Sequence, residues 1–411
     1  MSSRDISPET LALSPSDTPT ITRAARTLIK LLGGLRHGCL SLHTPDNRHQ
    51  IFGNPNDKQH VDWYLHDWGV CEAILTGGDI ALGETYMDGR WHCNNIPALV
   101  GLAIANRSVL EKAIRGNLFN LLGYRLRHAL RVNSKAGSRK NILAHYDLGN
   151  EFYRLWLDKS MTYSAALFEK DVQCSLLDAQ VAKYSRILDQ LDVRANQRVL
   201  EIGCGWGGFA EIAAERGVQL TGVTLSPSQL AYARARTAHF TLAIRPELSL
   251  TDYRDIRGQY DHVVSIEMFE AVGERYWSSY FSLLKSVLKP GGRALIQTIT
   301  IDDKLFKSYR RGTDFIQQYV FPGGMLPSIS VFRQKALDAG LRTVATYEFG
   351  QDYAETLRHW RASFHDVWEQ VKTLGFDERF HRLWDFYLAY CEAGFAAGST
   401  HVYQIELAHA C

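Results

Sequence analysis

A glycine-rich segment, VLEIGCGWGGFAEIAA at residues 199–214, constrains the fold of this 411-residue chain more than any other feature. A strand-like run breaks there into four glycines, and a helical pattern starts directly afterwards. Glycine lets the backbone pass close to a ligand, and the N-terminus of a helix offers unpaired N–H groups. The segment therefore predicts a ligand-binding turn between a strand and a helix.

The chain around this turn alternates between strand-like and helical patterns. The strand-like segments are residues 198–203, 218–225, 248–252, 260–266 and 293–300. Apolar strands separated by helices predict an α/β fold with a doubly wound parallel sheet. In such a sheet ligands bind outside the carboxyl ends of the strands, which is where the glycines lie.

The spacing of the glycines disfavours a dinucleotide site. The dinucleotide fingerprint is G-x-G-x-x-G with an acidic residue about 20 positions later. Here the order is G-C-G-W-G-G, and the second strand ends as GVTLSPSQ, without an acid. A nicotinamide-dependent oxidoreductase is therefore a distant alternative.

Composition excludes several other classes. With 46 basic and 44 acidic side chains there is no global field that would require nucleic acid. The seven scattered cysteines form no C-x-x-C pair, which argues against a disulfide framework or a zinc site and for a reducing compartment. No window carries about 18 continuous apolar residues, so no membrane span is predicted.

The chain divides into four predicted parts. Residues 1–22 are predicted to be a disordered tail without a secretory signal, and residues 23–132 a smaller mixed α/β accessory or membrane-docking domain. Residues 133–141 are a predicted linker, and residues 142–411 carry the alternating pattern.

An amphipathic, basic segment closes the first domain. In residues 117–132, NLFNLLGYRLRHALRV, apolar residues share one arc, and residues 107–140 hold nine basic side chains against Glu111. Two interpretations stay open: a helix packed on the core with a solvated polar face, or a helix lying on an anionic membrane.

Seven motifs occur together and in order. They are HYDLGNEFYRLWLD (145–158), MTYS (161–164), EIGCGWGG (201–208), GVTLSPSQ (222–229), DYRDI (252–256), MFEAVG (268–273) and FPGGMLPS (321–328). This set resembles the cyclopropane fatty acid synthase family of S-adenosylmethionine-dependent class I methyltransferases, and GDIALGETYMDGRW (78–91) extends the resemblance loosely into the first domain. The resemblance implies a Rossmann-like methyltransferase sheet, a helical cap over an acyl pocket from residues 354–397, and a late strand at 400–408.

The resemblance also implies a set of residues that bind S-adenosylmethionine. Tyr163 and Ser164 would border its methionine part, and Thr224, Leu225 and Gln229 its adenosine, with Gln229 on the ribose. The remaining members of the set are Glu201, Gly203, Gly205 and Trp206 at the turn and Asp252 and Tyr253 near the adenine.

Methyl transfer to a cis double bond leaves a cationic carbon, and a base must then remove a proton. Loss of the proton from the new methyl group closes a cyclopropane ring, whereas loss from a chain carbon gives a methyl-branched or methylene alkene. Aromatic faces can stabilise the cation. The candidates are Trp206, Phe269, Tyr319, Phe321, Tyr353 and Trp360.

In the family that this chain resembles, the base is a bicarbonate held by a Cys, a Glu, a His, a Tyr and main-chain groups. Glu270 and Tyr353 match that pattern, and Ile299 could still give its main chain. Two positions depart, since Ala165 stands in place of the Cys and Gln297 in place of the His. Bicarbonate binding is therefore expected to be weakened or re-formed.

Two further residues have competing interpretations. Glu267 lies three positions before Glu270, so the two carboxylates could share a face, and such a pair could raise one pKa and provide a base, or hold a cation. It could equally be a polar residue at a strand end. Cys391 matches a cysteine assigned as catalytic in the family, but alkene methylation needs no thiol nucleophile, and we interpret it as a buried structural cysteine.

The sequence therefore predicts a C-methyltransferase that acts on unsaturated acyl chains of membrane phospholipids, with ring closure as the main expectation. Its partners would be S-adenosylmethionine, a phospholipid membrane and bicarbonate as a candidate base, without metal or nucleic acid. The expected location is the cytoplasm, peripherally at the inner face of the cell membrane, and a homodimer stays open. The alternatives are a methylated alkene product and a non-catalytic lipid-binding protein.

Overall fold

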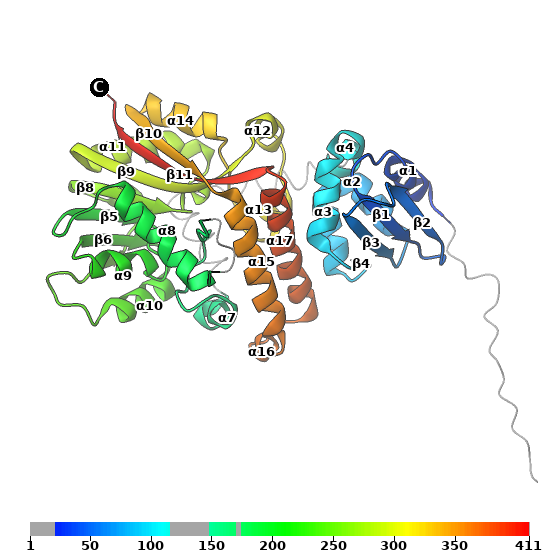
Figure 1. The fold of residues 1–411 in the computed structure, drawn as a ribbon, viewed down its shortest axis with the longest axis horizontal. Coiled ribbons are helices and arrows are strands. Elements are labelled where there is room, and N and C mark those ends of the chain that lie inside the picture. Colours follow the sequence, from blue (N-terminus) through cyan, green and yellow to red (C-terminus); the bar gives the residue numbers. More distant parts are fainter. Residues whose placement is uncertain (1–20, 116–147, 170–173, 411) are drawn as a thin grey trace, which may run out of the picture.

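The computed structural model describes residues 21–115, 148–169 and 174–410. Figure 1 shows a smaller N-terminal unit beside a larger unit that holds the long sheet. The amphipathic segment at 117–132, the predicted linker at 133–141 and nearly all of the predicted tail lie outside the described residues. None of the described helices combines the length and the apolar character that a membrane crossing requires.

The N-terminal unit is a four-stranded sheet in the order β2-β1-β3-β4, with helices packed on one face. Its elements are α1 (Arg23–Leu32), β1 (Cys39–His43), β2 (His49–Gly53), β3 (His60–Leu65), α2 (Gly69–Met87), β4 (Trp91–Cys93), α3 (Ile96–Ala105) and α4 (Arg107–Arg115). Val61, Trp63 and Leu65 of β3 are buried, while the residues between them face outward. This alternation is the period of a strand with one covered face.

The larger unit is built on a seven-stranded sheet in the order β10-β11-β9-β8-β5-β6-β7. The strands are β5 (Arg198–Ile202), β6 (Gln219–Thr224), β7 (Glu247–Leu250), β8 (Tyr260–Ile266), β9 (Leu288–Ile301), β10 (Leu341–Glu348) and β11 (Thr400–His409). Strands β5 to β9 pair in parallel, and β11 runs antiparallel to both β9 and β10.

Helices flank this sheet and cap one end of it (Figure 1). They are α7 (Gly149–Trp156), α8 (Leu176–Gln190), α9 (Gly208–Glu215), α10 (Pro227–Thr237), α11 (Trp277–Val287), α12 (Asp303–Tyr309), α13 (Phe315–Tyr319), α14 (Ile329–Asp338), α15 (Gly350–Asp366), α16 (Trp368–Thr373) and α17 (Glu378–Ala396), with short 3₁₀ turns η1 (Tyr253–Asp255), η2 (Phe269–Ala271) and η3 (Glu274–Tyr276). The α/β class, the five predicted strands, the helical stretch at 354–397 and the late strand are confirmed. Strand β10, LRTVATYE, was not predicted, although Gly340 precedes it and it alternates between buried or half-buried and exposed residues.

The N-terminal unit rests on the cap helices rather than on the sheet. A continuous apolar core joins Trp63 and Trp91 of the first unit to Trp384 and Phe386 of α17. Polar contacts cross the same boundary, since the Tyr86 hydroxyl donates to Asp385 at 2.6 Å and the Tyr390 hydroxyl donates to Asp79 at 2.7 Å. Helix α17 of the cap is thereby bound to the N-terminal unit by apolar and polar contacts.

Candidate active site

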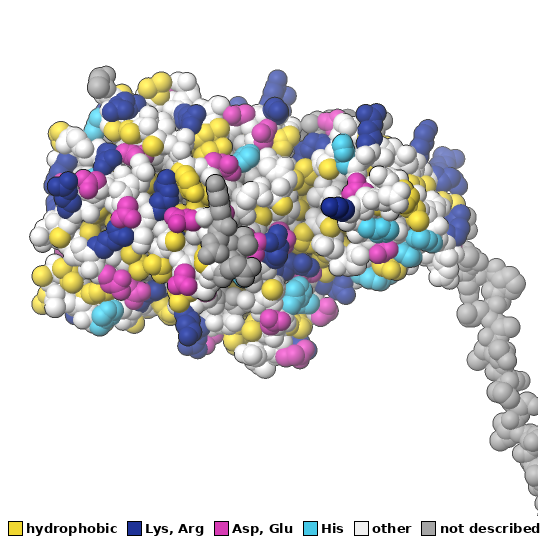
Figure 2. Space-filling model, viewed as in Figure 1, with side chains coloured by type: hydrophobic (Ala, Val, Ile, Leu, Met, Phe, Trp, Pro, Cys, Tyr) yellow, Lys and Arg dark blue, Asp and Glu magenta, His cyan; other side chains and the backbone are white. Residues whose placement is uncertain are grey.

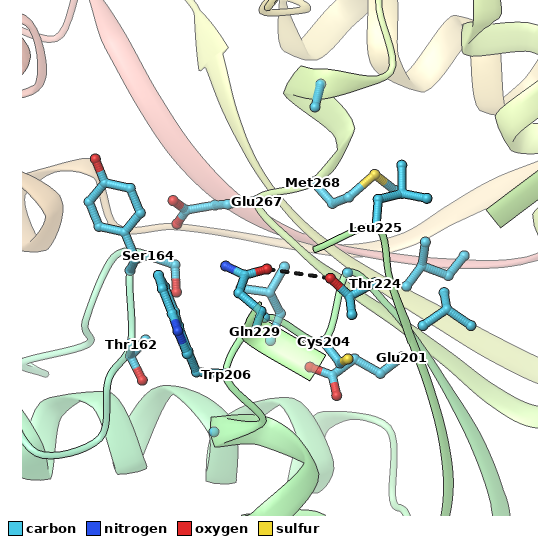
Figure 3. Close-up of a pocket in the computed structure, with 18 of the residues that line it drawn as sticks. Thr162, Ser164, Glu201, Cys204, Trp206, Thr224, Leu225, Gln229, Glu267 and Met268 are labelled. Carbon is cyan, nitrogen blue, oxygen red and sulfur yellow. Dashed lines mark hydrogen bonds between the residues drawn. The ribbon is translucent and has the colours of Figure 1, made fainter. Parts of the chain in front are cut away.

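A pocket of about 970 Å³, counted with its part open to solvent, lies at the carboxyl ends of β5, β6 and β8. Figure 3 shows Ser164 and Trp206 on one side of it, Thr224 and Leu225 on the other, and Gln229 between them. The predicted cofactor residues that line it are Tyr163, Ser164, Glu201, Gly203, Gly205, Trp206, Thr224, Leu225, Gln229 and Tyr253. Asp252 does not line the pocket, and its carboxylate accepts from Arg254 at 2.6 and 2.7 Å.

The glycine turn owes its shape to two different constraints. Gly207 has a φ of +81°, and a Cβ there would lie 2.9 Å from Cβ of Ala233, so helix α10 excludes a side chain. Gly205 also has a positive φ, +49°, but no atom lies within 4 Å of a Cβ built on it. The backbone at Gly205 is therefore open toward the pocket, and a ligand can approach it closely.

The side chains around the turn are held by hydrogen bonds. The Trp206 indole donates to Asn150 at 2.8 Å, and the Thr224 hydroxyl donates to the buried Gln229 amide at 3.4 Å, which is the dashed line in Figure 3. Gln229 lies in the first turn of α10, whose N-terminal cap is Ser226. The amide is thus fixed at the edge of the pocket, where it can accept from or donate to a ribose.

Glu201, on β5, is buried with one carboxylate oxygen that has no hydrogen-bond partner among the described residues. Burial raises the pKa of this carboxyl to about 8, against the lowering effect of Lys183. A buried polar atom without a partner is costly unless a ligand completes it. The lining carboxylate is therefore suited to a bound molecule that offers a donor.

Lys183 is a buried residue of the site that sequence reasoning missed. From α8 its ammonium donates to the Ser164 hydroxyl at 2.6 Å and to Gln180 at 2.7 Å, while the Gln180 amide donates to the Ser164 carbonyl at 3.0 Å. Burial lowers the pKa of Lys183 to about 7. No motif surrounds this lysine, and only its place among apolar positions of an amphipathic helix could have drawn attention to it.

Glu267 is the centre of the polar cluster at the pocket wall. Its Oε1 accepts from the main-chain N–H of Ala165 and from the Gln297 amide, both at 2.8 Å, and its Oε2 accepts from the Tyr353 hydroxyl at 2.7 Å. The residue has a φ of +49°, a conformation that costs about 1–2 kcal/mol for a side chain other than glycine. Burial raises the pKa of Glu267, while its hydrogen bonds and Lys183 oppose that rise.

Gln297 is oriented by a chain of hydrogen bonds behind it. Arg186 donates to the Gln404 carbonyl at 2.6 Å, and the Gln404 amide donates to the Gln297 carbonyl at 3.1 Å. Arginine can only donate, so each amide must accept on one side and donate on the other. The chain leaves the Gln297 N–H₂ group pointing at Glu267.

Glu270 faces β9 instead of the pocket. Its Oε1 accepts from the Thr298 hydroxyl at 2.9 Å and from the main-chain N–H of Ile299, and its Oε2 is buried without a partner among the described residues. Burial and the charge of Glu267 raise the pKa of Glu270 to about 8. The two glutamates therefore interact electrostatically, but Glu267 lines the pocket whereas Glu270 is bonded to strand β9.

Aromatic side chains from the cap cover this cluster. Tyr353 packs on Phe395 with ring centroids 4.4 Å apart, and Tyr163 packs on Trp360 at 5.2 Å. Phe269, one of the predicted candidates for cation stabilisation, lies fully buried in the core against Trp277. Cys391 of α17 does not line the pocket, and burial raises the pKa of its thiol, which suits a structural residue.

Comparison with known proteins places this arrangement in a family. A model described as mycolic acid cyclopropane synthetase matches residues 133–405, more than half of the chain. The chain belongs to the mycolic acid cyclopropane synthetase family.

Relatives and solved structures of this cyclopropane synthetase family agree with the match. The tuberculostearic acid methyltransferase of Mycobacterium tuberculosis is 41% identical over 346 residues, which cover 82% of this chain and 81% of that protein. The cyclopropane-fatty-acyl-phospholipid synthase of Escherichia coli is 34% identical over 359 residues, covering 85% and 88%.

A crystal structure of the mycolic acid cyclopropane synthase CmaA1, complexed with SAH and CTAB, superimposes with a TM-score of 0.62 at 31% identity. It covers 66% of this chain and 97% of its own. The seven-stranded sheet of this family member thus has the class I methyltransferase fold, as predicted, with a smaller α/β part before it.

Proposed function

We propose that this protein transfers a methyl group from S-adenosylmethionine to the cis double bond of unsaturated phospholipid acyl chains and closes a cyclopropane ring. The observation that carries the proposal is the Glu267 carboxylate, which lines the pocket and is held by three donors beside the glycine turn. We assign residues 142–411 to the methyltransferase domain and residues 23–132 to the accessory domain.

The pocket fits S-adenosylmethionine in several independent ways. Gly205 leaves an open approach to the backbone, Glu201 has a buried oxygen without a partner among the described residues, and Gln229 presents an amide. Trp206 and Tyr163 would hold the methionine end, and Tyr253 the adenine. When bound, S-adenosylmethionine supplies an electrophilic methyl group, as the SAH in the related crystal structure suggests.

The residues of the chain position the substrate, exclude water from the pocket and provide a base. Because an alkene is a weak nucleophile, the pocket must hold it in line with the methyl group and exclude water. Tyr163 lines the pocket and packs on Trp360, which in turn contacts Tyr353, so Tyr163 is the ring of this group that could face positive charge developing on the acyl chain. Loss of one proton from the new methyl group then lets the C–H electron pair close the ring.

We assign the proton acceptor to Glu267. The Ala165 N–H, the Gln297 amide and the Tyr353 hydroxyl, at positions that hold bicarbonate in the family this chain resembles, all donate to the Glu267 carboxylate. A side-chain carboxylate thus takes the position of the free anion. The departures at Ala165 and Gln297 become understandable, since the small residue and the amide together accommodate a built-in base.

The product distinguishes ring closure from the alternative. Purified protein, phosphatidylglycerol vesicles with oleoyl chains and S-adenosylmethionine would be incubated with and without bicarbonate, and the lipid examined by proton NMR. Shielded cyclopropyl protons in both arms are the expected result. Vinylic protons with a branched methyl group would assign the methylated alkene instead. The tuberculostearic acid relative, which is named as a methyltransferase, is the reason to test this alternative.

A non-catalytic lipid-binding role is the competing class. It predicts that no label passes from methyl-labelled S-adenosylmethionine to lipid. The proposed enzyme should instead label the lipid at a rate proportional to the enzyme concentration. Absence of label with correctly folded protein that binds S-adenosylhomocysteine would overturn the proposed function.

Access to acyl chains requires contact with a membrane, and we include peripheral attachment at the cytoplasmic face in the proposal. The basic segment with Arg125, Arg127 and Arg131 supports it by charge, although that segment lies outside the described residues. A variant with the three arginines changed to Gln should float less with anionic vesicles than the parent. The homodimer stays a proposal that sedimentation of the purified protein tests.

A further inference from the structure

The outward face of the N-terminal sheet gathers histidines to an unusual degree. Five of the chain's 15 histidines lie on or beside it, and Figure 2 shows them close together on the smaller unit. They are His43 of β1, His49 of β2, His60 of β3, His92 of β4, and His66 directly after β3. Apart from the half-buried His43, they are exposed. We call this surface the histidine face.

The strand register places four rings of this face in one row. His43 pairs with His49 on one side and with Tyr64 on the other, and Tyr64 pairs with His92. The rings stack across all four strands, with centroids 4.6, 4.0 and 4.5 Å apart. His66 extends the row, since its Nε2 lies 2.8 Å from Nδ1 of His92.

The second row of the same face is neutral or apolar except for one acid. Ile51, which is 50% exposed, and Ser41 lie opposite each other in the register, and Asp62 follows them. The Asn94 amide donates to Asp62 at 3.0 Å, and His43 lies 3.4 Å from the same carboxylate. The face thus combines flat rings, an exposed aliphatic side chain and a single carboxylate.

Three carboxylates around the face are paired with arginines, whereas Asp62 on the face lies 3.4 Å from His43 and 3.9 Å from His60. Asp46 is bound to Arg48, Asp67 to Arg90 and Asp88 to Arg379, all within 3.2 Å. Burial lowers the pKa of His92. The neighbouring His66, Arg382 of the cap helix α17 and His43 lower it further through their positive charge. These three pairs add little net charge, so proton uptake by the imidazoles changes the charge of the face most directly.

These features describe a surface whose charge can change when its imidazoles take up protons. Imidazole is the side chain that changes its charge between pH 8 and 5. No group of three or more His, Cys, Asp or Glu among the described residues has the arrangement of a metal site, so a metal does not account for the cluster. Phosphate groups of lipids accept hydrogen bonds from imidazolium, and ring and aliphatic side chains favour the membrane interface.

We propose that the histidine face docks on anionic phospholipid bilayers and that proton uptake by its imidazoles strengthens this docking. The choice of a bilayer as partner rests on the proposed function, because the acyl substrate lies there. An anionic surface at about −30 mV concentrates protons roughly threefold, so the surface itself promotes the charged form of the face. The attachment would thus be strongest on acidic-lipid membranes and under acid conditions.

Vesicle flotation tests the proposal. The parent protein would be mixed at constant ionic strength with vesicles of phosphatidylglycerol and phosphatidylcholine, or of phosphatidylcholine alone, at pH 7.5 and 5.5. Since one cation near the surface is worth about fivefold in binding, partitioning onto the anionic vesicles should rise at least about tenfold at pH 5.5. Partitioning onto pure phosphatidylcholine should stay low at both pH values.

Two variants make the role of the face specific. Changing His49, His60, His66 and His92 to Gln should abolish the rise at pH 5.5, and changing the same four residues to Lys should give tight binding already at pH 7.5. Changing the exposed His37 and His239 to Gln is the matched control and should behave as the parent. Thermal unfolding at pH 7.5 checks that each variant is folded.

The proposal is overturned if the Gln variant keeps the full pH response, or if that variant loses self-association instead of lipid binding, which would make the face an interface between copies. Methyl transfer to detergent-dispersed phospholipid separates this outcome from the proposed function. Parent and Gln variant should transfer methyl groups at equal rates there. If neither does, the proposed function fails while the flotation result still decides the docking.

Discussion

Gln297 donates its side-chain amide to Oε1 of Glu267 at 2.8 Å, while its carbonyl oxygen accepts from Gln404 on the neighbouring strand. The direction of this bond is set from behind, because Arg186 can only donate to Gln404. The carboxylate is thus offered two N–H donors and one hydroxyl, an arrangement that holds it in place and opposes the rise in its pKa that burial causes. Changes at Glu267, Gln404 and Lys183, which surround this carboxylate, have definite expected outcomes.

Changing Glu267 to Gln should lower the rate of methyl transfer by about 10²–10⁴-fold, because the amide cannot accept the proton. Binding of S-adenosylhomocysteine, measured by calorimetry, should stay within about threefold of the parent, since the fold of the pocket is kept. Changing the exposed Glu151 to Gln serves as the control. A Glu267 variant that turns over at the parental rate would remove Glu267 from the mechanism.

Changing Gln404 to Glu should reverse the direction of the hydrogen bond between residue 404 and Gln297. The new carboxylate only accepts, so Gln297 would turn its N–H₂ group toward it and its carbonyl oxygen toward Glu267. The two facing acceptors should lower the turnover at least about tenfold and cost about 1–3 kcal/mol of unfolding free energy. Steady-state kinetics and urea unfolding measure both, with Gln351 changed to Glu on the surface as the matched control. Parental kinetics in the Gln404 variant would show that the chain does not orient Gln297.

Changing the buried Lys183 to Met should shift the pH dependence of turnover. The lysine's positive charge lowers the pKa of Glu267, so its removal raises that pKa. Glu267 then stays protonated to a higher pH, and the acid limb of the rate profile should move to higher pH. Affinity for S-adenosylhomocysteine should also fall, because Ser164 loses its donor. Changing the exposed Lys159 to Met should leave the profile unmoved, and an unmoved profile in the Lys183 variant would contradict the prediction.

Glycine-to-alanine changes should separate binding from stability. Both Gly205 and Gly207 have positive φ, so alanine costs about 1–2 kcal/mol of backbone strain at either position. Only Gly207 meets a neighbour, Ala233, so its variant should be the less stable by thermal unfolding. The Gly205 variant places its methyl group toward the pocket and should show the larger loss of S-adenosylhomocysteine affinity. Equal affinities in the two variants would argue against a ligand at Gly205.

The stability of the protein should depend on Glu270 in a defined pH window. Burial and Glu267 raise the pKa of Glu270 from 4.5 to about 8, so between these values the unfolded chain releases a proton that the folded protein keeps. Stability is therefore lost as the pH rises through this window. Changing Glu270 to Gln should flatten the fall in unfolding free energy between pH 5 and 8, measured by urea unfolding. An equally steep fall in the variant would assign the effect to other groups.

Local patterns in the sequence were sufficient for the sheet and the cofactor pocket. Strand, glycine turn and helix follow one another at residues 199–214, and the parallel topology then forces the carboxyl ends of β5 and β6 to meet at one edge. Gly205, Trp206 and Gln229 were predicted as cofactor residues from the family resemblance that the ordered motifs carry, and all three line the pocket. The late strand and the cap were predictable for the same reason, as each is a continuous segment with its own period.

Long-range contacts supply the observations behind the proposed base and the proposed docking surface. Glu267 could be read as a base or as a polar strand end until Ala165, Gln297 and Tyr353 were seen to converge on it from three separate segments. Lys183 carries no local signal, and the histidines of the N-terminal sheet are scattered in the sequence until the strand register stacks them. Periodicity and turn chemistry act over a few residues, so the sequence by itself determined the elements and the turn. The direction of a hydrogen bond and the environment of a buried charge depend on which distant side chains meet, and only the tertiary structure decided them.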